Sequence, residues 1–292
     1  MSTQSNAIES ARDALVKRVN RKTLWRLMPF LMLCYFINYL DRSNLSIAAV
    51  NGMNEDLGLT ATTYGIAAGV FFIGYILLEI PSNLALHKFG ARKWISRIMV
   101  SWGAVACLIA FVPNANWLYT MRFLLGVAEA GFTPGILLYL TYWFVQKNRG
   151  LANSLFLVGI PLSNVIGAPV ASWLVAIGHD IMFGLTGWRF MIFITGVPAV
   201  LLGIMCWFFL TDRPADAKWL TAEERAVLIE EMAKEDAGEV HEASALGALK
   251  SARAWILGLG YFGLVFGLYA ISFFLPTIIR GFQEMYNVEY ST

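Results

Sequence analysis

The most constraining feature of this sequence is an apolar run from Leu24 to Val50 that carries two opposite charges side by side, Asp41 and Arg42. A helix of about 20 residues, rising about 1.5 Å per residue, crosses the roughly 30 Å hydrocarbon layer of a bilayer. The run therefore predicts a membrane-spanning helix with the charged pair near mid-membrane. A charge at that depth costs roughly 2.5 to 3.5 kcal/mol on insertion scales, which favours a functional pair. The alternative is a neutralised ion pair that only joins two helices.

The composition agrees with a membrane protein. Hydrophobic residues make up 58% of the chain, charged residues 14%, and the mean hydropathy is +0.59, which is too apolar for a soluble protein of 292 residues. Cys34, Cys107 and Cys206 lie in apolar segments without metal-ligand spacing, so we expect them to pack in the interior. We find no phosphate-binding loop, nucleophile with a base, or metal cluster, and expect no enzymatic activity, cofactor, metal or nucleic-acid partner.

Further apolar runs predict seven spans joined by loops of alternating charge. The expected spans are 24–50, 61–86, 95–112, 117–144, 151–177, 188–210 and 255–279. Every loop assigned to the inside carries Lys or Arg, and every complete loop assigned to the outside lacks both, as the positive-inside rule requires. This pattern predicts a multi-pass protein of the inner (plasma) membrane with a cytoplasmic N-terminus.

The same pattern divides the chain into four parts. We expect a cytoplasmic tail at 1–23, a six-helix transmembrane bundle at 24–210, a cytoplasmic amphipathic linker at 211–251, and at 252–292 a seventh transmembrane helix that begins an incomplete second bundle. In the linker, Thr221 and Glu224 have capping-box spacing, and an apolar stripe follows the same helix. That stripe consists of Leu220, Val227, Leu228 and Met232.

Helical rise also places the buried charges by depth. Counted from Leu27, Asp41 and Arg42 lie about 21 to 23 Å into the bilayer, and Arg122 lies at about 22 Å from the same side. Glu129 follows Arg122 by two turns on the same helical face, about 10 Å nearer the cytoplasm. Two arginines at one level suit bidentate recognition of a carboxylate.

We therefore hypothesise that Arg42 and Arg122 hold an organic anion while Asp41 and Glu129 exchange protons. The alternative is two structural pairs, Asp41 with Arg122 and Arg42 with Glu129. Three further polar residues are candidates for the same cavity, although such residues also form hydrogen bonds between membrane helices. They are Tyr39, Tyr75 and Asn164.

Several motifs in this order resemble the major facilitator superfamily, and in particular its anion:cation symporters, which include tartrate, phthalate, sugar-acid and sialin-like transporters. The motifs are YLDRSNLSIA (39–48), PSNLALHKFGARKW (81–94), RFLLGVAEAGFTPG (122–135), DRPADAKWLTAEE (212–224) and FFLPTII (273–279). The resemblance runs from about Lys22 to Phe282.

The resemblance implies an all-α membrane fold of two six-helix bundles, with helices one and four lining a central cavity. It assigns substrate and proton roles to the positions of Asp41, Arg42, Arg122 and Glu129. It also implies a gating loop after helix two, formed here by Asn83, His87, Gly90, Arg92 and Lys93. The acidic position of that loop is Leu86, so we expect the family's usual charge-dipole latch to be missing.

Relative to twelve helices the chain is truncated, because helices eight to twelve are absent. We expect the missing second bundle, in a longer chain or a second polypeptide, to be required for transport. The predicted function is proton-coupled uptake of a small organic anion, such as a sugar acid, a tartrate-like acid or an aromatic acid. The alternatives are an anion exchanger or facilitator, or a non-transporting bundle in which the charges are structural.

Overall fold

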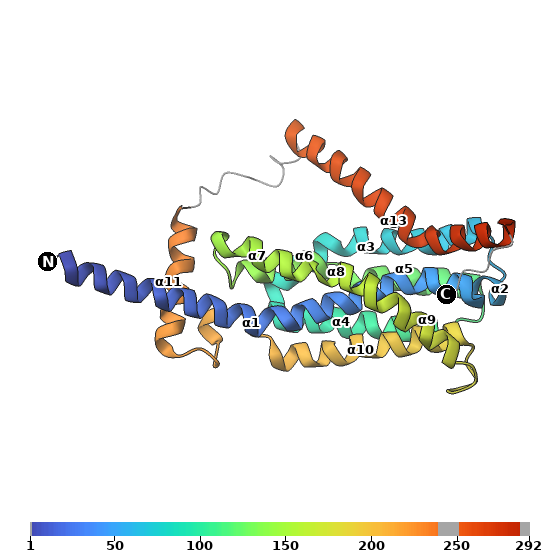
Figure 1. Ribbon diagram of the computed structural model, residues 1–292, viewed down its shortest axis with the longest axis horizontal. Helices are drawn as coiled ribbons and strands as arrows, with labels where there is room; N and C mark the ends of the chain where they lie inside the picture. Colours follow the sequence, from blue (N-terminus) through green and yellow to red (C-terminus); the bar gives the residue numbers. More distant parts are fainter. Residues whose placement is uncertain (1, 239–250, 287–292) are drawn as a thin grey trace.

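The computed structural model describes residues 2–238 and 251–286, and all regular structure in these residues is helical (Figure 1). The longer α-helices are α1 (Ser2–Ala48), α3 (Ala61–Phe89), α4 (Ala91–Ile109), α5 (Ala115–Glu129), α6 (Phe132–Thr141), α7 (Gln146–Leu157), α9 (Ala168–Ile177), α10 (Gly187–Phe209), α11 (Ala222–Gly238) and α13 (Ala252–Tyr286). Short elements connect them: η1 (Ala49–Met53), α2 (Asn54–Asp56), α8 (Gly159–Leu162), η2 (Ser163–Gly167) and η3 (Pro214–Asp216).

Six helical segments of the described residues are long and apolar enough to cross a membrane, which confirms the predicted all-α membrane fold. They are Ser10–Asp56, Ala61–Phe89, Ala115–Thr141, Gln146–Ile177, Gly187–Phe209 and Ala252–Gln283. The one expected span missing from these six, 95–112, corresponds to α4. This helix has only 19 residues and begins with three cations, so it is less apolar, yet it packs inside the bundle against α10 and α5. Those cations are Arg92, Lys93 and Arg97.

Two of the expected spans are interrupted helices. The fourth consists of α5 and α6, separated at Gly131, whose φ of +83° is a left-handed conformation that glycine adopts without strain. The fifth consists of α7, α8, η2 and α9, with a π-helical turn at Ser163–Gly167 just after Pro161. Pro161 lacks a backbone N–H donor, so the helix is weakened just before the π-helical turn. Turns of this kind often occur at functional sites.

Glycines set the closest approaches between helices of the bundle. A Cβ at Gly103 of α4 would lie 2.7 Å from the Val200 nitrogen of α10, and one at Gly203 would lie 2.8 Å from the Val100 nitrogen in return. Between α3 and α5, a Cβ at Gly126 would clash with the backbone oxygen of Phe71. Small residues allow this backbone contact, which is a main source of helix association in lipid.

Replacing Gly126 by Ala is expected to destabilise the bundle, because the backbone of α3 cannot give way as a flexible side chain would. Overpacking of this kind costs about 1 to 3 kcal/mol. The measurement is thermal unfolding in detergent, with Gly69→Ala as the control, since a Cβ at Gly69 meets nothing within 4 Å. Equal melting temperatures for the two variants would contradict this account of the α3–α5 contact.

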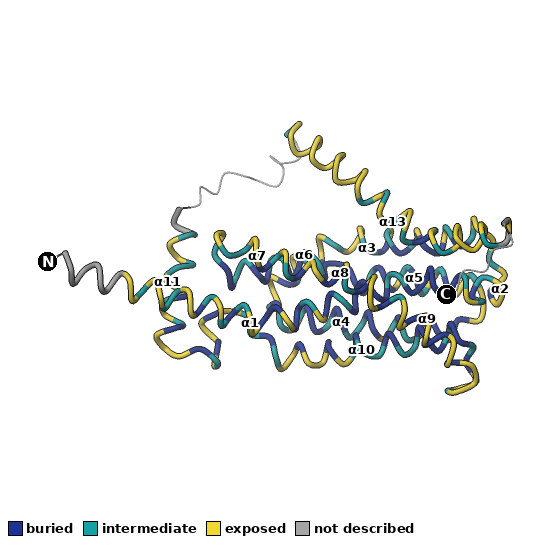
Figure 2. The backbone as a smooth tube through the Cα atoms, in the orientation of Figure 1, coloured by how far each residue is buried: buried dark blue, intermediate teal, exposed yellow. Residues whose placement is uncertain are grey.

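The bundle and α13 differ in how far their residues are buried. Figure 2 shows buried residues following the inner sides of α1, α4 and α5, whereas the first half of α13 is exposed along its length. The second half of α13 contacts the bundle: the Tyr64 hydroxyl of α3 donates a 2.9 Å hydrogen bond to the Phe273 oxygen, and Phe72 packs on Tyr269 at 4.8 Å. Arg280 also bonds to the Val50 oxygen beyond the end of α1. Its C-terminal half thereby attaches α13, the expected seventh span, to the first bundle.

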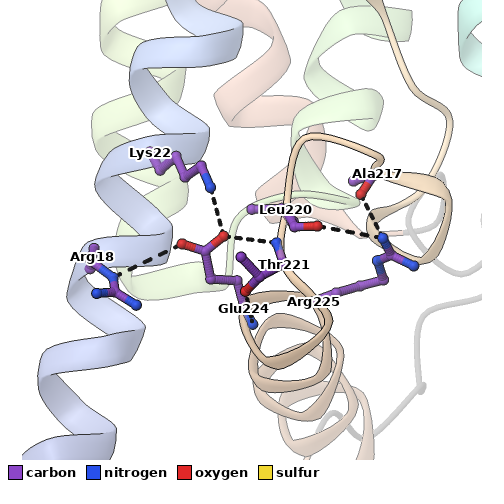
Figure 3. A network of polar contacts seen from close by, with 7 residues as sticks. All are labelled: Arg18, Lys22, Ala217, Leu220, Thr221, Glu224 and Arg225. Atoms are coloured by element: carbon purple, nitrogen blue, oxygen red, sulfur yellow. Dashed lines mark hydrogen bonds and ion pairs between the residues drawn. The ribbon is translucent and has the colours of Figure 1, made fainter.

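Residues 2–23, predicted as a cytoplasmic tail, continue α1 as one helix. The predicted linker contains α11, whereas 239–250 lie outside the described residues. Figure 3 shows Glu224 of α11 between the two helices: it accepts a 2.6 Å hydrogen bond from Lys22 Nζ and lies 3.9 Å from Arg18 Nε. Glu224 also closes the predicted capping box, accepting from Thr221 N at 3.0 Å. The long-range contacts with α11 explain why the polar tail is helical.

A second set of ion pairs extends this junction across the bundle. Arg12 lies 2.9 Å from Glu230 and 2.8 Å from Glu231. At the far end of α11, Glu235 accepts the backbone N–H of Gln146 at 2.8 Å and pairs with Arg149 at 2.9 Å, which caps the start of α7. Helix α11 therefore bridges α1 and α7. The proposed four-part division of the chain stays a prediction.

The α1–α11 junction is expected to weaken in acid. The hydrogen bond from Lys22 and that from the Thr221 backbone hold the pKa of Glu224 below its ordinary value. A depressed pKa contributes stability above the unfolded value of about 4.3, and this contribution is lost as the pH falls through the folded pKa. Hydrogen exchange of α11 amides should rise in that window. Glu224→Gln should lose this acid-sensitive step, whereas exposed Glu223→Gln should keep it; an identical response in both variants would contradict the assignment.

Candidate substrate and proton site

The predicted charges lie inside the bundle on α1 and α5. Asp41, Arg122 and Glu129 are all buried, with exposures of 6%, 3% and 0%. The side chain of Arg42 is 14% exposed. Charges this far from water require partners, since an isolated buried ion is costly. Their partners therefore define the chemistry of the site.

Arg42 and Glu129 form a direct ion pair between α1 and α5. Arg42 donates to Oε1 of Glu129 from Nε at 2.8 Å and from Nη2 at 2.5 Å. Asn38, one turn before Arg42, donates from Nδ2 to the same oxygen at 2.8 Å. Sequence reasoning missed Asn38, although a polar residue four positions before a buried cation was a usable signal.

The third guanidinium nitrogen of Arg42 reaches α13, the expected seventh span. Nη1 donates to the Tyr269 hydroxyl at 2.5 Å, and the guanidinium carbon lies 5.3 Å from the centre of the Tyr75 ring. Predicted Tyr75 is thus brought to the site. Tyr269 was not predicted, because no local pattern shows which face of the seventh helix meets Arg42.

Arg122 lies close to Arg42 and forms no ion pair within 4.0 Å with a carboxylate of the described residues. Its Nε donates to the Ala67 oxygen of α3 at 3.1 Å. Its guanidinium lies 4.9 Å from the centre of the Phe71 ring, and that of Arg42 lies 5.6 Å from the same ring. Both arginines therefore lie within cation–π distance of the same aromatic ring.

Asp41 has its hydrogen-bond partner on a different helix, α4. It accepts a 2.8 Å hydrogen bond from the indole Nε1 of Trp102 on α4, and both residues are buried. No ion pair within 4.0 Å joins Asp41 to Arg122 among the described residues. Of the two structural pairs considered from the sequence, Arg42 with Glu129 is present and Asp41 with Arg122 is absent.

The two remaining predicted cavity residues, Tyr39 and Asn164, differ in how far they are buried. Tyr39 is 5% exposed, and its hydroxyl has no hydrogen bond within the described part of the chain. Asn164 lies in the π-helical turn and is exposed. The structure therefore brings Tyr75 to the charged cluster, leaves Tyr39 with an unpaired hydroxyl, and does not bury Asn164.

The predicted gating loop is held by a residue that lies far from it in the sequence, at the same end of the bundle. Asp212, just after α10, accepts from the Arg92 nitrogen at 2.8 Å, and its other oxygen lies 3.9 Å from Arg92 Nε. Gly90 has a φ of +88°, and a Cβ there would lie 2.9 Å from the Asp212 carboxylate. Leu86, at the family's acidic position, is buried. Asp212 thus caps α4 from outside the loop.

The other residues of that loop make local contacts. His87 Nδ1 lies 3.1 Å from the Tyr142 hydroxyl, and Asn83 donates to the Glu79 oxygen of its own helix at 3.1 Å. Lys93 is exposed. A gating role for these residues stays a prediction.

Comparison with known proteins identifies the class. Residues 31–291 match the family model of the Major Facilitator Superfamily, so the chain belongs to this superfamily of multi-pass membrane proteins. It is 49% identical over 269 residues to a putative tartrate transporter of Agrobacterium vitis, covering 92% of this chain and 59% of that protein. It is 42% identical over 288 residues to the putative metabolite transport protein NicT of Pseudomonas putida, covering 97% and 65%.

Solved structures show the same fold. A bacterial homologue of the human lysosomal transporter Spinster superposes with a TM-score of 0.64 at 21% identity, covering 93% of this chain and 57% of that one. The xylose transporter XylE from E. coli superposes with a TM-score of 0.67 at 14% identity, covering 88% and 65%. The chain thus spans less than two thirds of the length of these relatives.

Replacing Trp102 by Phe is expected to destabilise the protein, because it leaves the buried Asp41 carboxylate without its indole donor. A hydrogen bond to a charged group contributes about 1.5 to 3 kcal/mol. Thermal unfolding measures this loss. Trp143→Phe is the control for lost ring volume, since Trp143 is equally buried and stacks on Trp219 at 5.4 Å. The assignment is wrong if both variants lose the same stability.

Proposed function

We propose that this chain forms the first bundle and the seventh helix of a proton-coupled transporter that takes up a small organic anion. The observation that carries the proposal is the buried ion pair in which both Nε and Nη2 of Arg42 bind one oxygen of Glu129. This pair occupies the groups of Arg42 that would recognise a carboxylate. Anion binding and the charge of Glu129 are therefore linked.

The linkage follows from competition for one guanidinium. While Glu129 is ionised, its carboxylate satisfies Arg42 and excludes a second anion. A proton on Glu129 removes that charge, leaves Arg42 with an uncompensated positive charge in a low-dielectric interior, and favours an incoming carboxylate. Loss of the proton restores the internal pair and expels the anion. Proton and anion would then move together.

Neighbouring groups support binding of an organic anion at this place. Arg122 contacts the same Phe71 ring as Arg42 and has no carboxylate within 4.0 Å among the described residues, so it adds positive potential. Tyr75 and Tyr269 supply a hydroxyl and aromatic faces beside the guanidinium. Asp41, hydrogen-bonded to Trp102, is a second candidate proton carrier.

The substrate class is a small carboxylate. A pair of arginines suits one or two carboxylate groups. The similarity to the putative tartrate transporter of Agrobacterium vitis supports a tartrate-like hydroxy acid. Sugar acids and aromatic acids present the same carboxylate and stay within the proposal. An exchanger or facilitator using the same cavity is the alternative, and insensitivity of uptake to a protonophore would favour it.

The rest of the transport cycle requires a second bundle. Rocking of one bundle against another needs both, and the chain spans less than two thirds of the relatives' length. Tyr269 is the described contact by which Arg42 reaches the helix that begins that second bundle. The proposed location is the inner membrane, with the N-terminus in the cytoplasm.

Glu129→Gln in a complete transporter that carries this sequence should bind and exchange the anion but not accumulate it uphill, because Gln is neutral whatever the pH. The measurement is uptake into proteoliposomes under a proton gradient, with and without protonophore. Exposed Asp216→Asn is the control and should behave as wild type. Uphill accumulation that persists in Glu129→Gln would refute coupling through this residue.

A further inference from the structure

The two carboxylate oxygens of Glu129 have unequal surroundings. Oε1 accepts three hydrogen bonds, one from Asn38 at 2.8 Å and two from Arg42 at 2.8 and 2.5 Å. Oε2 is buried and has no hydrogen-bond partner among the described residues. A buried acceptor without a donor is costly, so this oxygen is where an added proton gains most.

Asn38 has a matching unpaired atom. The residue is 0% exposed; its Nδ2 donates to Glu129, whereas its Oδ1 is buried without a donor in the described part of the chain. Both unpaired oxygens therefore belong to groups that are already joined by one hydrogen bond. Two acceptors repel one another, but a protonated carboxyl has an O–H donor that an amide oxygen accepts.

We propose that the proton taken up by Glu129 resides on Oε2 and is held by Oδ1 of Asn38, which makes Asn38 a positioning residue for proton coupling. This inference rests on the proposed function and names the atoms that carry it out. Hydronium delivers the proton: one of its O–H bonds breaks as the new O–H bond forms at Oε2, and a water molecule is released. Oε1 becomes the carbonyl oxygen of a neutral acid and a weaker acceptor, so an incoming anion can take over the Arg42 N–H groups.

For proton uptake by Glu129, the acceptor oxygen Oδ1 of Asn38 is more important than its donor Nδ2. Oε1 already holds two N–H groups of Arg42, so the N–H of Asn38 is a third donor to a satisfied oxygen. Oδ1 is the matching acceptor for a proton on Oε2. Removing Asn38 therefore penalises the protonated carboxyl, whose buried O–H would lose its acceptor, more than the ionised one.

The charged and titratable groups facing this cluster come from four helices. They are Tyr35, Asp41 and Arg42 of α1, Tyr75 of α3, Arg122 of α5 and Tyr269 of α13. A substitution at Asn38 leaves all of them in place. A change in proton uptake then reports the amide itself.

The test is infrared titration of the purified chain in lipid nanodiscs, following the carboxylic-acid carbonyl band that disappears in Glu129→Gln. In Asn38→Leu, which has a similar volume and no amide, the midpoint of this band should fall by on the order of one pH unit. Asn44→Leu is the matched control, because Asn44 is buried on the same helix and donates instead to Thr195 at 2.8 Å. Its midpoint should equal that of wild type.

Each outcome decides the proposal. If Asn38→Leu melts below wild type, Asn38→Ala replaces it, since Ala removes the same amide without adding apolar volume. A midpoint that stays constant or rises in both variants would overturn the role of Asn38 while leaving Glu129 as a proton carrier. A wild-type chain that shows no Glu129 acid band while folded would overturn proton coupling through Glu129, and with it the proposed function as argued from the Arg42–Glu129 pair.

Discussion

The ion pair between Arg42 and Glu129 is the interaction on which the rest of the site depends. It joins α1 to α5 in the interior, and the remaining Arg42 nitrogen joins both to α13 through Tyr269. Breaking a buried pair costs about 3 to 5 kcal/mol, yet replacing the whole pair by apolar residues is often neutral or stabilising. The pair is therefore a poor device for stability alone. Its arrangement, with one carboxylate oxygen satisfied and the other unpaired, suits a group that changes protonation.

Helical geometry explains why the two neighbours on α1 have different partners. Consecutive residues project about 100° apart on a helix, so Arg42 meets Glu129 while Asp41 meets Trp102 of α4. The Asp41–Arg122 pair, which the sequence left open as an alternative, is therefore not formed within 4.0 Å in the described residues. Arg122 instead donates to a backbone oxygen and lies on the Phe71 ring, which leaves its charge without a carboxylate in the described residues.

At the end of the bundle that carries the α3–α4 loop, residues far apart in the sequence provide helix caps that the neighbouring residues do not supply. Asp212 caps α4, whose own N-cap residue is Gly90, and Glu235 caps α7 at Gln146. Glu224 serves the capping box of α11 and the ion pair with α1 at once. Asp212, which follows α10, thus holds the predicted gating loop, whose position 86 carries Leu.

The sequence by itself determined the all-helical membrane fold and the capping box at Thr221, because hydropathy and cap spacing are local properties. The superfamily followed from motifs in a fixed order. Tertiary structure alone decided the partners: Asn38 and Tyr269 at Arg42, Trp102 at Asp41, and the continuation of α1 into the polar tail through α11. Which helical faces meet depends on packing of the whole bundle, and no local pattern records it.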